Sequence, residues 1–521
     1  MSQMLKSSGA FASATLTSRV LGMVREIVYA RFMGDTAVAS AFKLAFQIPN
    51  LFRRLLGEGA LSAAFIPIFK AKERTEGALE MWRSANAVIS GLVVAAALIV
   101  GGVMLGVSLA LAMRDFSEST RLMLELLRLM FPYMLVITVT AVFMGMLNAR
   151  GFFFIPALGA VILNLVLIAS VLLLAPRFGL ELSQQIFGVA VGVLVAGVAQ
   201  AAFQLPPLFG EGFRYRWVSP WTNPTVREVV RKMIPGMFGV AAFQVNVLLT
   251  NCIAFWVEPR IVASFDYAVR LMELPQGVFG ISLATYLLPT LAGIAAEKNY
   301  SEFRGTLRQG LSYLLFLNVI ASVLLFILAE PIVRLLFERG MFTEESTRGA
   351  AFALACLAPG LVAFSMVNVL ARAFYALGDT QSPMKISVFC LAMNLVFVVW
   401  LIGPFRQGGL GIANSITATC NAGLLLYALR RKLSRLELSG FMAMLPAIAG
   451  AGVIAGFIAH LTWRAWEKGM GQETLWAKLG AVFVPMALAG LAYWMIALVL
   501  RVPAAREITA LLRRRLGTDD K

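Results

Sequence analysis

Seven basic residues interrupt stretches of this sequence that are otherwise apolar enough to cross a membrane. They are Arg19, Arg25, Lys43, Arg53, Arg54, Arg270 and Arg372. A cation at the centre of a bilayer costs about 2.5–3.5 kcal/mol on insertion scales, so it persists where it faces a wet cavity or a partner. Guanidinium groups in such a cavity bind phosphate or carboxylate through charge-assisted, bidentate hydrogen bonds. The pattern indicates a binding site for an anionic, amphipathic cargo.

Arg19 and Arg25 flank Gly22 in the first apolar stretch. On a helix, residues six positions apart project about 120° from each other. Both side chains can therefore reach a broad cavity but not a narrow seam. The alternative is that each side chain extends to the nearest membrane surface. We interpret both arginines as cavity-lining ligands.

The second apolar stretch is both bent and charged. Its helix-weakening residues are Pro49, Gly57, Gly59 and Pro67. Arg54 and Glu58 have the i, i+4 spacing of an intrahelical ion pair, which is the structural alternative to a binding role. Even then, Arg53 has no local partner in the sequence. We interpret Arg53 as a ligand and Glu58, together with Arg54, as a gate or charge partner.

The second half of the sequence contributes Arg270, which precedes Glu273 by three residues. This spacing also permits a simple ion pair within one helix. We interpret Arg270 as the ligand and Glu273 as its charge partner. Arg372 lies near a cytoplasmic end, where a long side chain extends to the membrane surface. Lys43 lies near the opposite end of its stretch and fits surface extension and cavity lining equally well.

The composition determines which elements must position these side chains. Of 521 residues, 59% are hydrophobic and 14% are charged, whereas a soluble domain carries roughly a quarter charged residues. This excludes a disordered chain, a disulfide-stapled secreted domain and an ordinary cytosolic enzyme. The net charge of +17 points to an anionic lipid surface rather than to nucleic acid. We predict an all-α integral membrane protein.

Cysteine and histidine are too sparse for a metal or cofactor site. The residues are Cys252, Cys356, Cys390, Cys420 and His460. Each cysteine lies alone in an apolar run, as a small buried hydrophobe would. We expect no metal and no cofactor. Acid–base or magnesium chemistry also needs Asp- or His-rich loops, and their scarcity argues against an enzyme.

Reading the sequence with the twenty-residue length of a membrane helix gives about fourteen spans. The connections on one side carry roughly twice as many Lys and Arg residues as those on the other, which places the richer side in the cytoplasm. The even number of spans puts both termini there.

An internal repeat divides the chain. Pro132, Gly151 and Pro156 return as Pro359, Gly378 and Pro383, each displaced by 227 residues. The displacement covers six spans, so both copies have the same orientation, as in transporters with parallel repeats. We predict a six-helix lobe at 1–220, a second at 221–435, and two further helices with a basic cytoplasmic tail at 436–521.

At these motifs the chain resembles the MurJ (MviN) lipid II flippase family of the multidrug/oligosaccharidyl-lipid/polysaccharide exporter superfamily. The most specific segments are 18–22 (SRVLG), 49–54 (PNLFRR), 57–60 (GEGA) and 270–275 (RLMELP). The resemblance covers essentially the whole chain.

The resemblance implies specific roles. Arginines matching Arg19, Arg25, Arg53 and Arg270 line the central cavity of the family, and an acid matching Glu58 is important there. They would bind the pyrophosphate and peptide carboxylates of lipid II, undecaprenyl-pyrophosphoryl-MurNAc-pentapeptide-GlcNAc, as it moves between leaflets by alternating access. The last two helices would hold the polyprenyl tail. Membrane lipids, and cell-wall synthesis or division proteins, are candidate partners in the bacterial inner membrane.

The chain departs from the family pattern at two places. Some members have an acid where this chain has Ser40, so a gate proposed there is in doubt. Some members also use an acid in the seventh span for sodium binding. Here that span, 226–256, carries Gln244, Asn246 and Asn251 in its membrane part, while its acid, Glu228, lies at the cytoplasmic end. The membrane part of this span therefore lacks the acid of such a sodium site, and the membrane potential is the driving force that we expect.

Three other functions compete with this interpretation. A flippase of another polyprenyl-linked oligosaccharide shares the same architecture. A cationic-drug exporter should carry carboxylates in its cavity, where arginines dominate here. A channel is disfavoured by the repeat and the broken helices, which are typical of alternating access.

Overall fold

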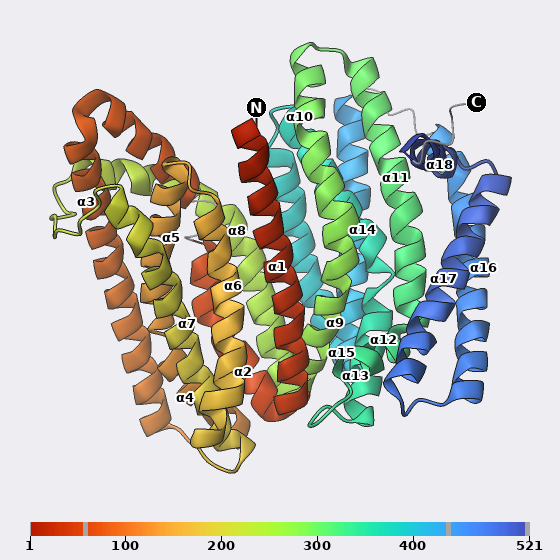
Figure 1. Cartoon of the computed structure of the whole chain (residues 1–521), viewed down its shortest axis with the longest axis horizontal. Coiled ribbons are helices and arrows are strands. Elements are labelled where there is room, and N and C mark those ends of the chain that lie inside the picture. Colours follow the sequence, from red (N-terminus) through yellow and green to blue (C-terminus); the bar gives the residue numbers. More distant parts are fainter. Residues whose placement is uncertain (1, 56–60, 434–438, 516–521) are drawn as a thin grey trace. The chain divides into compact units, whose positions relative to one another are not determined.

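The computed structural model describes residues 2–55, 61–433 and 439–515. These residues form helices with short connections, and no strand occurs among them, which confirms the all-α prediction. The chain divides into two compact units, Met1–Ala263 and Ser264–Lys521. They run from red to green and from green to blue in Figure 1. The predicted division at 220/221 and 435/436 concerns repeats and stays a prediction.

The helices of the first unit are long and mostly apolar. They are α1 Ser2–Met33, α2 Ala37–Leu55, α3 Leu61–Met113, α4 Glu118–Met130, α5 Tyr133–Ala149, α6 Phe154–Ala169, α7 Leu182–Gly210 and α8 Pro224–Val257. Helix α3 changes direction at Gly77, whose φ of 85° is one that glycine adopts without strain. A π-helical turn, Ser170–Leu174, extends α6.

Helix α9, Arg260–Pro275, contains the boundary between the units. The helices that follow are α10 Ser282–Ala296, α11 Tyr300–Ile327, α12 Ala329–Phe337, α13 Glu344–Leu357, α14 Gly360–Ala376, α15 Gln381–Lys432, α16 Ser439–Met470, α17 Leu475–Val499 and α18 Pro503–Arg515. A π-helical turn, Gln276–Ile281, joins α9 to α10. The short helix α12 was not expected from the sequence.

Several predicted spans correspond to broken or merged helices. Among the described residues, eight helices are long and apolar enough to cross a membrane, or up to ten if two bent pairs each count as one span. Helix α15 shows why such counts differ: its backbone is non-helical at Arg406. The amide of Asn394 donates to Asn414 Oδ1 at 3.3 Å, so its two arms lie side by side. The count of about fourteen spans stays a prediction.

The local structure follows the 227-residue displacement seen in the sequence. Helix α5 begins after Pro132 and α14 begins after Pro359, and both bounds of these 17-residue helices differ by that displacement. The preceding bends are also alike, 42° between α4 and α5 and 48° between α13 and α14. Gly151 and Gly378 follow with φ of 90° and 73°. Each half therefore repeats a bent helix pair closed by a left-handed glycine.

Ion pairs fasten the turn after each of these helices, with reversed polarity. In the first unit Arg150 Nε donates to Glu211 Oε2 at 2.6 Å and the guanidinium also contacts Glu73. The Glu211 carboxylate raises the pKa of Arg150. In the second unit Asp379 accepts from Lys432 Nζ at 2.6 Å. This bond lowers the pKa of Asp379 to about 2.

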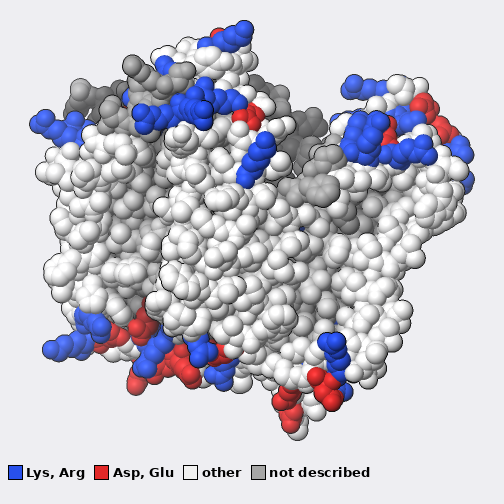
Figure 2. Space-filling view, turned by 180° about the vertical axis from the view of Figure 1, so that it is seen from behind, with Lys and Arg blue, Asp and Glu red and all other residues white. Residues whose placement is uncertain are grey.

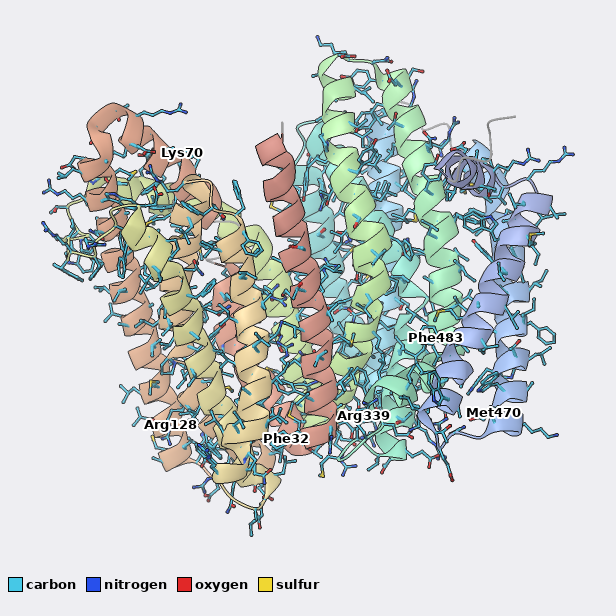
Figure 3. The ribbon with its side chains drawn as sticks, viewed as in Figure 1. Phe32, Lys70, Arg128, Arg339, Met470 and Phe483 are labelled. Carbon is cyan, nitrogen blue, oxygen red and sulfur yellow. The ribbon has the colours of Figure 1, made fainter. Side chains whose placement is uncertain are left out.

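The apolar and charged surfaces of each unit are segregated as membrane helices require. On the face drawn in Figure 2, charged side chains gather at the two ends of the helices and the surface between is uncharged. In the first unit, Figure 3 places Lys70 at the end opposite Phe32 and Arg128. The core of this unit is aromatic, with Phe69, Trp82 and Phe213 in successive ring contacts. The units have the surface of multi-pass membrane proteins.

Candidate functional site: charged clusters within apolar helices

Arg25 belongs to a cluster that joins three helices of the first unit. Its Nη1 donates to Asn164 Oδ1 of α6 at 3.0 Å, and its Nη2 donates to Glu26. Lys43 of α2 lies 3.8 Å from the other carboxylate oxygen of Glu26. We name these four residues, Arg25, Glu26, Lys43 and Asn164, the Glu26 cluster.

Burial makes the charges of the Glu26 cluster interdependent. Glu26 is only 3% exposed, and the side chains of Arg25 and Lys43 are 16% and 10% exposed. The Arg25 guanidinium also lies over the ring of Tyr29, 5.6 Å from its centroid. Removing one charge from a buried pair leaves the other uncompensated, which is strongly destabilising. Lys43 therefore pairs with Glu26 rather than extending to the membrane surface.

Arg19 has a different environment from Arg25. Its side chain is exposed on α1, as are the neighbouring apolar side chains of Leu16 and Val20. The carbonyl of the preceding residue, Ser18, accepts a bond of 3.2 Å from Asn164 Nδ2. Asn164 thus connects the backbone beside Arg19 with the guanidinium of Arg25.

Arg53 and Arg54 project from the last turn of α2 toward different partners. Arg53 Nε donates to Asn50 Oδ1 at 2.8 Å within the same helix, so the expectation that Arg53 lacks a local partner was wrong. Arg54 Nη1 donates to Gln244 Oε1 of α8 at 3.4 Å. The predicted pair of Arg54 with Glu58 falls outside the residues that the structure describes.

A polar seam connects α2 with α8. Besides Arg54 and Gln244, Asn251 Nδ2 donates to Gln47 Oε1 at 2.7 Å. Each helix contributes residues seven positions apart, in opposite order along the chain, so the two helices run antiparallel. Two of the three amides named above for the seventh predicted span, Gln244 and Asn251, thus contact α2 in this structure.

Arg270 lies between two acids on its own helix, α9. Nη1 donates to Glu273 Oε2 at 3.0 Å, which is the i, i+3 ion pair that the sequence permits. Nη2 is 3.6 Å from Asp266 Oδ1, one turn earlier. All three side chains are partly exposed, between 29% and 49%. Both of these acids lie on the same helix as the guanidinium that they contact.

The other two residues discussed from the sequence have defined partners. Ser40 is fully buried, and its Oγ accepts the backbone N–H of Ala263 at 3.0 Å. It thereby satisfies one of the amides that the first turn of α9 leaves free. Arg372 Nη1 donates to Thr285 Oγ1 of α10 at 3.1 Å.

Sequence reasoning missed the acids that accompany the arginines. Glu26 directly follows Arg25 in an apolar stretch, and Asp266 precedes Arg270 by one helical turn. Both signals were visible as acid–arginine pairs inside predicted spans. Among the described side chains, no three His, Cys, Asp or Glu residues are grouped as metal ligands would be. The convergence of arginines from both halves on one cavity stays a prediction.

An apolar groove of about 640 Å³ lies between α11 and α16 in the second unit. Its lining includes Val319, Val323, Ile327, Gly452, Gly456 and Phe457. A Cβ added at Gly456 would come within 3.0 Å of Val323 Cγ1. The glycines therefore let the two helices approach closely, as small residues do in membrane bundles.

A buried arginine fastens α16 and α17 to the rest of the second unit. Arg334 of α12 is 6% exposed and contacts Glu330, Glu338 and Glu467, the last on α16, at 2.7, 3.1 and 3.4 Å. Lys478 of α17 lies 3.4 Å from Glu338. Figure 3 places Arg339 and Met470 at this same end of the unit.

Comparison with solved structures identifies the fold. The chain superposes on a structure described as lipid II flippase MurJ in an inward closed conformation, with a TM-score of 0.75 and 21% identity over 94% of this chain and 98% of that one. It also matches an inward-facing multidrug resistance transporter of the MATE family, with a TM-score of 0.65 and 16% identity over 82% of this chain and 99% of the other.

Comparison with curated sequences is more specific. A probable lipid II flippase MurJ of Vibrio cholerae is 33% identical over 501 residues, which cover 91% of this chain and 93% of the relative. The lipid II flippase MurJ of Burkholderia cenocepacia is 31% identical, covering 86% and 87%. The family model described as lipid II flippase MurJ matches residues 29–476. The family match covers most of the chain, and relatives about a third identical span nearly its whole length, so the chain belongs to the MurJ lipid II flippase family.

Proposed function

We propose that this chain moves lipid II from the cytoplasmic to the periplasmic leaflet of the bacterial inner membrane by alternating access. The observation that carries the proposal is the match of the family model over residues 29–476. That range includes Arg53 of α2 and Arg270 of α9, whereas Arg19 and Arg25 of α1 lie just before it. A doubly charged pyrophosphate needs such groups to pass between leaflets.

Arg19, Arg25, Arg53 and Arg270 bind the anionic headgroup in this proposal. Bidentate donors suit both pyrophosphate and peptide carboxylates. The exposed side chain of Arg19 and the partly exposed side chain of Arg270 support their access to substrate. Arg25 is held in place by Glu26 and Asn164, so it would present a fixed charge.

Glu58, Arg54 and Glu273 act as charge partners or gates. The Glu273 carboxylate is paired with the Arg270 guanidinium at 3.0 Å. Anionic groups of the headgroup would replace this carboxylate when the substrate binds. Arg54 reaches α8 through Gln244, so this contact would open and close as the helices move. Exchange of one anionic partner for another keeps the arginines neutralised at every step.

The polyprenyl tail would occupy the apolar groove between α11 and α16. Its volume of about 640 Å³ and its lining of valine, isoleucine and phenylalanine support an isoprenoid occupant. The buried contacts of Arg334 would keep α16 against the unit while the headgroup crosses.

The remaining features of the proposal follow from charge and family. The basic excess of one set of connections supports a cytoplasmic position for both termini. The cargo is moved and not chemically changed, so we assign no catalytic residue. Membrane lipids surround the protein, and cell-wall synthesis or division proteins are its candidate partners. The membrane potential can contribute about 2.3 kcal/mol per charge per 100 mV.

Depletion of the protein in cells tests this function. Lipid II should accumulate in the cytoplasmic leaflet and become inaccessible to a hydrolase that acts only on the outer leaflet. Re-expression of the wild type should restore access, and the Arg53→Ala or Arg270→Ala variant should not, although each inserts normally.

Two outcomes would contradict the proposal. Accumulation of another polyprenyl-linked oligosaccharide with lipid II unaffected would assign the protein to the competing flippase function. Normal access to lipid II in cells carrying the Arg19→Ala, Arg53→Ala double variant would remove the arginines from the binding site.

A further inference from the structure

The connection between α7 and α8, residues 211–223, follows helix α3 for more than two turns. The ring centroid of Phe213 is 5.6 Å from that of Trp82. Asn86 Nδ2 donates to the Arg214 carbonyl at 2.9 Å. We name residues 211–223 the α7–α8 connector. Figure 1 shows it as the yellow-green non-helical segment beside α3.

Further along α3, a single serine contacts two residues of the connector. Ser90 Oγ lies 3.2 Å from the Tyr215 hydroxyl and accepts the Val218 N–H at 3.4 Å. Pro220 packs next to Gly91, where an added Cβ would come within 3.1 Å of the proline ring. From Trp82 to Gly91 the connector thus tracks about 13 Å of helix at 1.5 Å per residue.

These contacts place the connector at the depth where α3 enters the apolar part of the membrane. The stretch of α3 without charged residues begins after Arg83, and within it Asn86 and Ser90 are only 4% and 0% exposed. Non-helical backbone persists at such depth only where its polar groups are satisfied by the protein. Asn86 and Ser90 supply these partners, which explains two polar residues inside an apolar helix.

The outer side of the connector carries the residues typical of a membrane interface. Tyr215, Trp217 and Trp221 are 49%, 59% and 72% exposed. Arg214 and Arg216 flank Tyr215 and are exposed. The Arg214 guanidinium donates through Nη1 to the Phe209 and Phe213 carbonyls and lies over the Phe209 ring. Tryptophan and tyrosine are enriched where headgroups meet acyl chains. Arginine binds phosphate oxygens with paired hydrogen bonds.

We propose that the α7–α8 connector is a binding site for anionic phospholipid. Trp217 and Trp221 lie in the headgroup layer, and Arg214 and Arg216 bind the lipid phosphate. The charge of the arginines and the depth set by Asn86 and Ser90 favour lipid over a soluble protein partner. The site concerns bulk membrane lipid and is independent of the transported cargo.

Photocrosslinking of the intact protein in nanodiscs tests the site. The photoreactive amino acid p-benzoylphenylalanine replaces Trp217, and the nanodisc contains phosphatidylcholine and phosphatidylglycerol in equal amounts. Mass spectrometry of the adducts should show phospholipid, with phosphatidylglycerol exceeding phosphatidylcholine. A cation near a membrane surface contributes about 1 kcal/mol toward anionic lipid. The ratio of the two adducts should therefore fall about fivefold for each of Arg214→Gln and Arg216→Gln.

The matched control is the same photoreactive residue at Glu76, whose exposed side chain lies at the bend of α3, before the uncharged stretch of this helix begins. It should give few lipid adducts. The proposal is overturned if Trp217 gives no more lipid adducts than Glu76, if it crosslinks to a second protein chain instead, or if the ratio is unchanged in the double arginine variant.

Discussion

The two units place arginine in apolar helices in different ways. In the first unit Arg25 is 16% exposed and contacts Glu26 and, on α6, Asn164, while Lys43 of α2 contacts the same acid. In the second unit Arg270 is 32% exposed, and the ion pairs with Asp266 and Glu273 lie within α9. The contacts of the Glu26 cluster join three helices, whereas these two ion pairs of Arg270 lie within one helix.

This difference distinguishes arginines that stabilise the fold from arginines that can bind an anionic ligand. A buried charge shared among three helices cannot move without breaking several bonds, so its loss should appear chiefly as lost stability. A partly exposed pair within one helix contributes little to stability and can exchange its partner. We infer that Arg270 is the better placed of the two to take up and release an anionic headgroup.

The largest expected effect on stability is that of Arg25→Ala. It leaves Glu26 buried with Lys43 as the remaining basic residue of the cluster, and should cost about 3 kcal/mol. Arg270→Ala should cost no more than about 1 kcal/mol. Equilibrium unfolding of both variants in the same detergent measures the contrast. Equal losses would show that the two arrangements are energetically alike.

Removing the whole set of charges sharpens this contrast. Substitution of Arg25, Glu26 and Lys43 by methionine leaves no unpaired charge and keeps most of the side-chain volume. Such replacements are often neutral for stability. The triple variant should therefore unfold within about 1 kcal/mol of the wild type. A loss larger than that of Arg25→Ala alone would mean that these charges stabilise the fold beyond neutralising one another.

A second buried arginine, in the second unit, tests whether the loss of stability depends on burial or on which unit contains the arginine. Arg334 is as buried as the Glu26 cluster and contacts Glu467 on α16. Arg334→Ala should cost about 3 kcal/mol because it leaves clustered carboxylates unpaired. Increased proteolysis of the connection between α16 and α17 would report the detachment of these helices. The exposed Arg348, paired with Glu344 on one helix, gives the control Arg348→Ala, which should unfold like the wild type.

The uncharged bond of the α2–α8 seam should have a smaller effect. Asn251→Ala removes the 2.7 Å bond to Gln47 and should cost about 1 kcal/mol. Because this bond holds α2 to α8 in the present conformation, disulfide trapping between these helices should become less efficient. Trapping that is unchanged while stability falls would limit the bond to a structural role.

The smallest effect is that of pH on the Asp379 turn. Its pKa is lowered to about 2 by the bond from Lys432, so the carboxylate stabilises the fold above its ordinary pKa and loses this contribution as pH falls toward 2. The difference in melting temperature between wild type and Asp379→Asn should be present at pH 7 and vanish near pH 2. A difference independent of pH would exclude the ionised pair as its cause.

The repeat was predictable from the sequence because its markers are residues with strong backbone preferences. Proline cannot continue a helix and glycine adopts positive φ, so Pro132, Gly151 and their counterparts at 359 and 378 mark the same bends and turns in the structure. These local rules need no knowledge of which helices pack together.

The partners of the arginines were only partly predictable. The pair of Arg270 with Glu273 follows from spacing along one helix and is confirmed. The pairing of Glu26 with Lys43 and of Arg25 with Asn164 depends on how α1, α2 and α6 pack. Spacing in the sequence does not contain that information. The connector contacts of Asn86 and Ser90 were invisible for the same reason.

The most direct test of the central claim is lipid II translocation in proteoliposomes. Fluorescent lipid II should move between leaflets with the wild type and with Arg348→Ala. Arg53→Ala and Arg270→Ala should each lower the rate by about 10- to 100-fold, the value of one or two charge-assisted hydrogen bonds. Wild-type rates in a folded variant carrying both substitutions would contradict the claim that these guanidinium groups carry the headgroup.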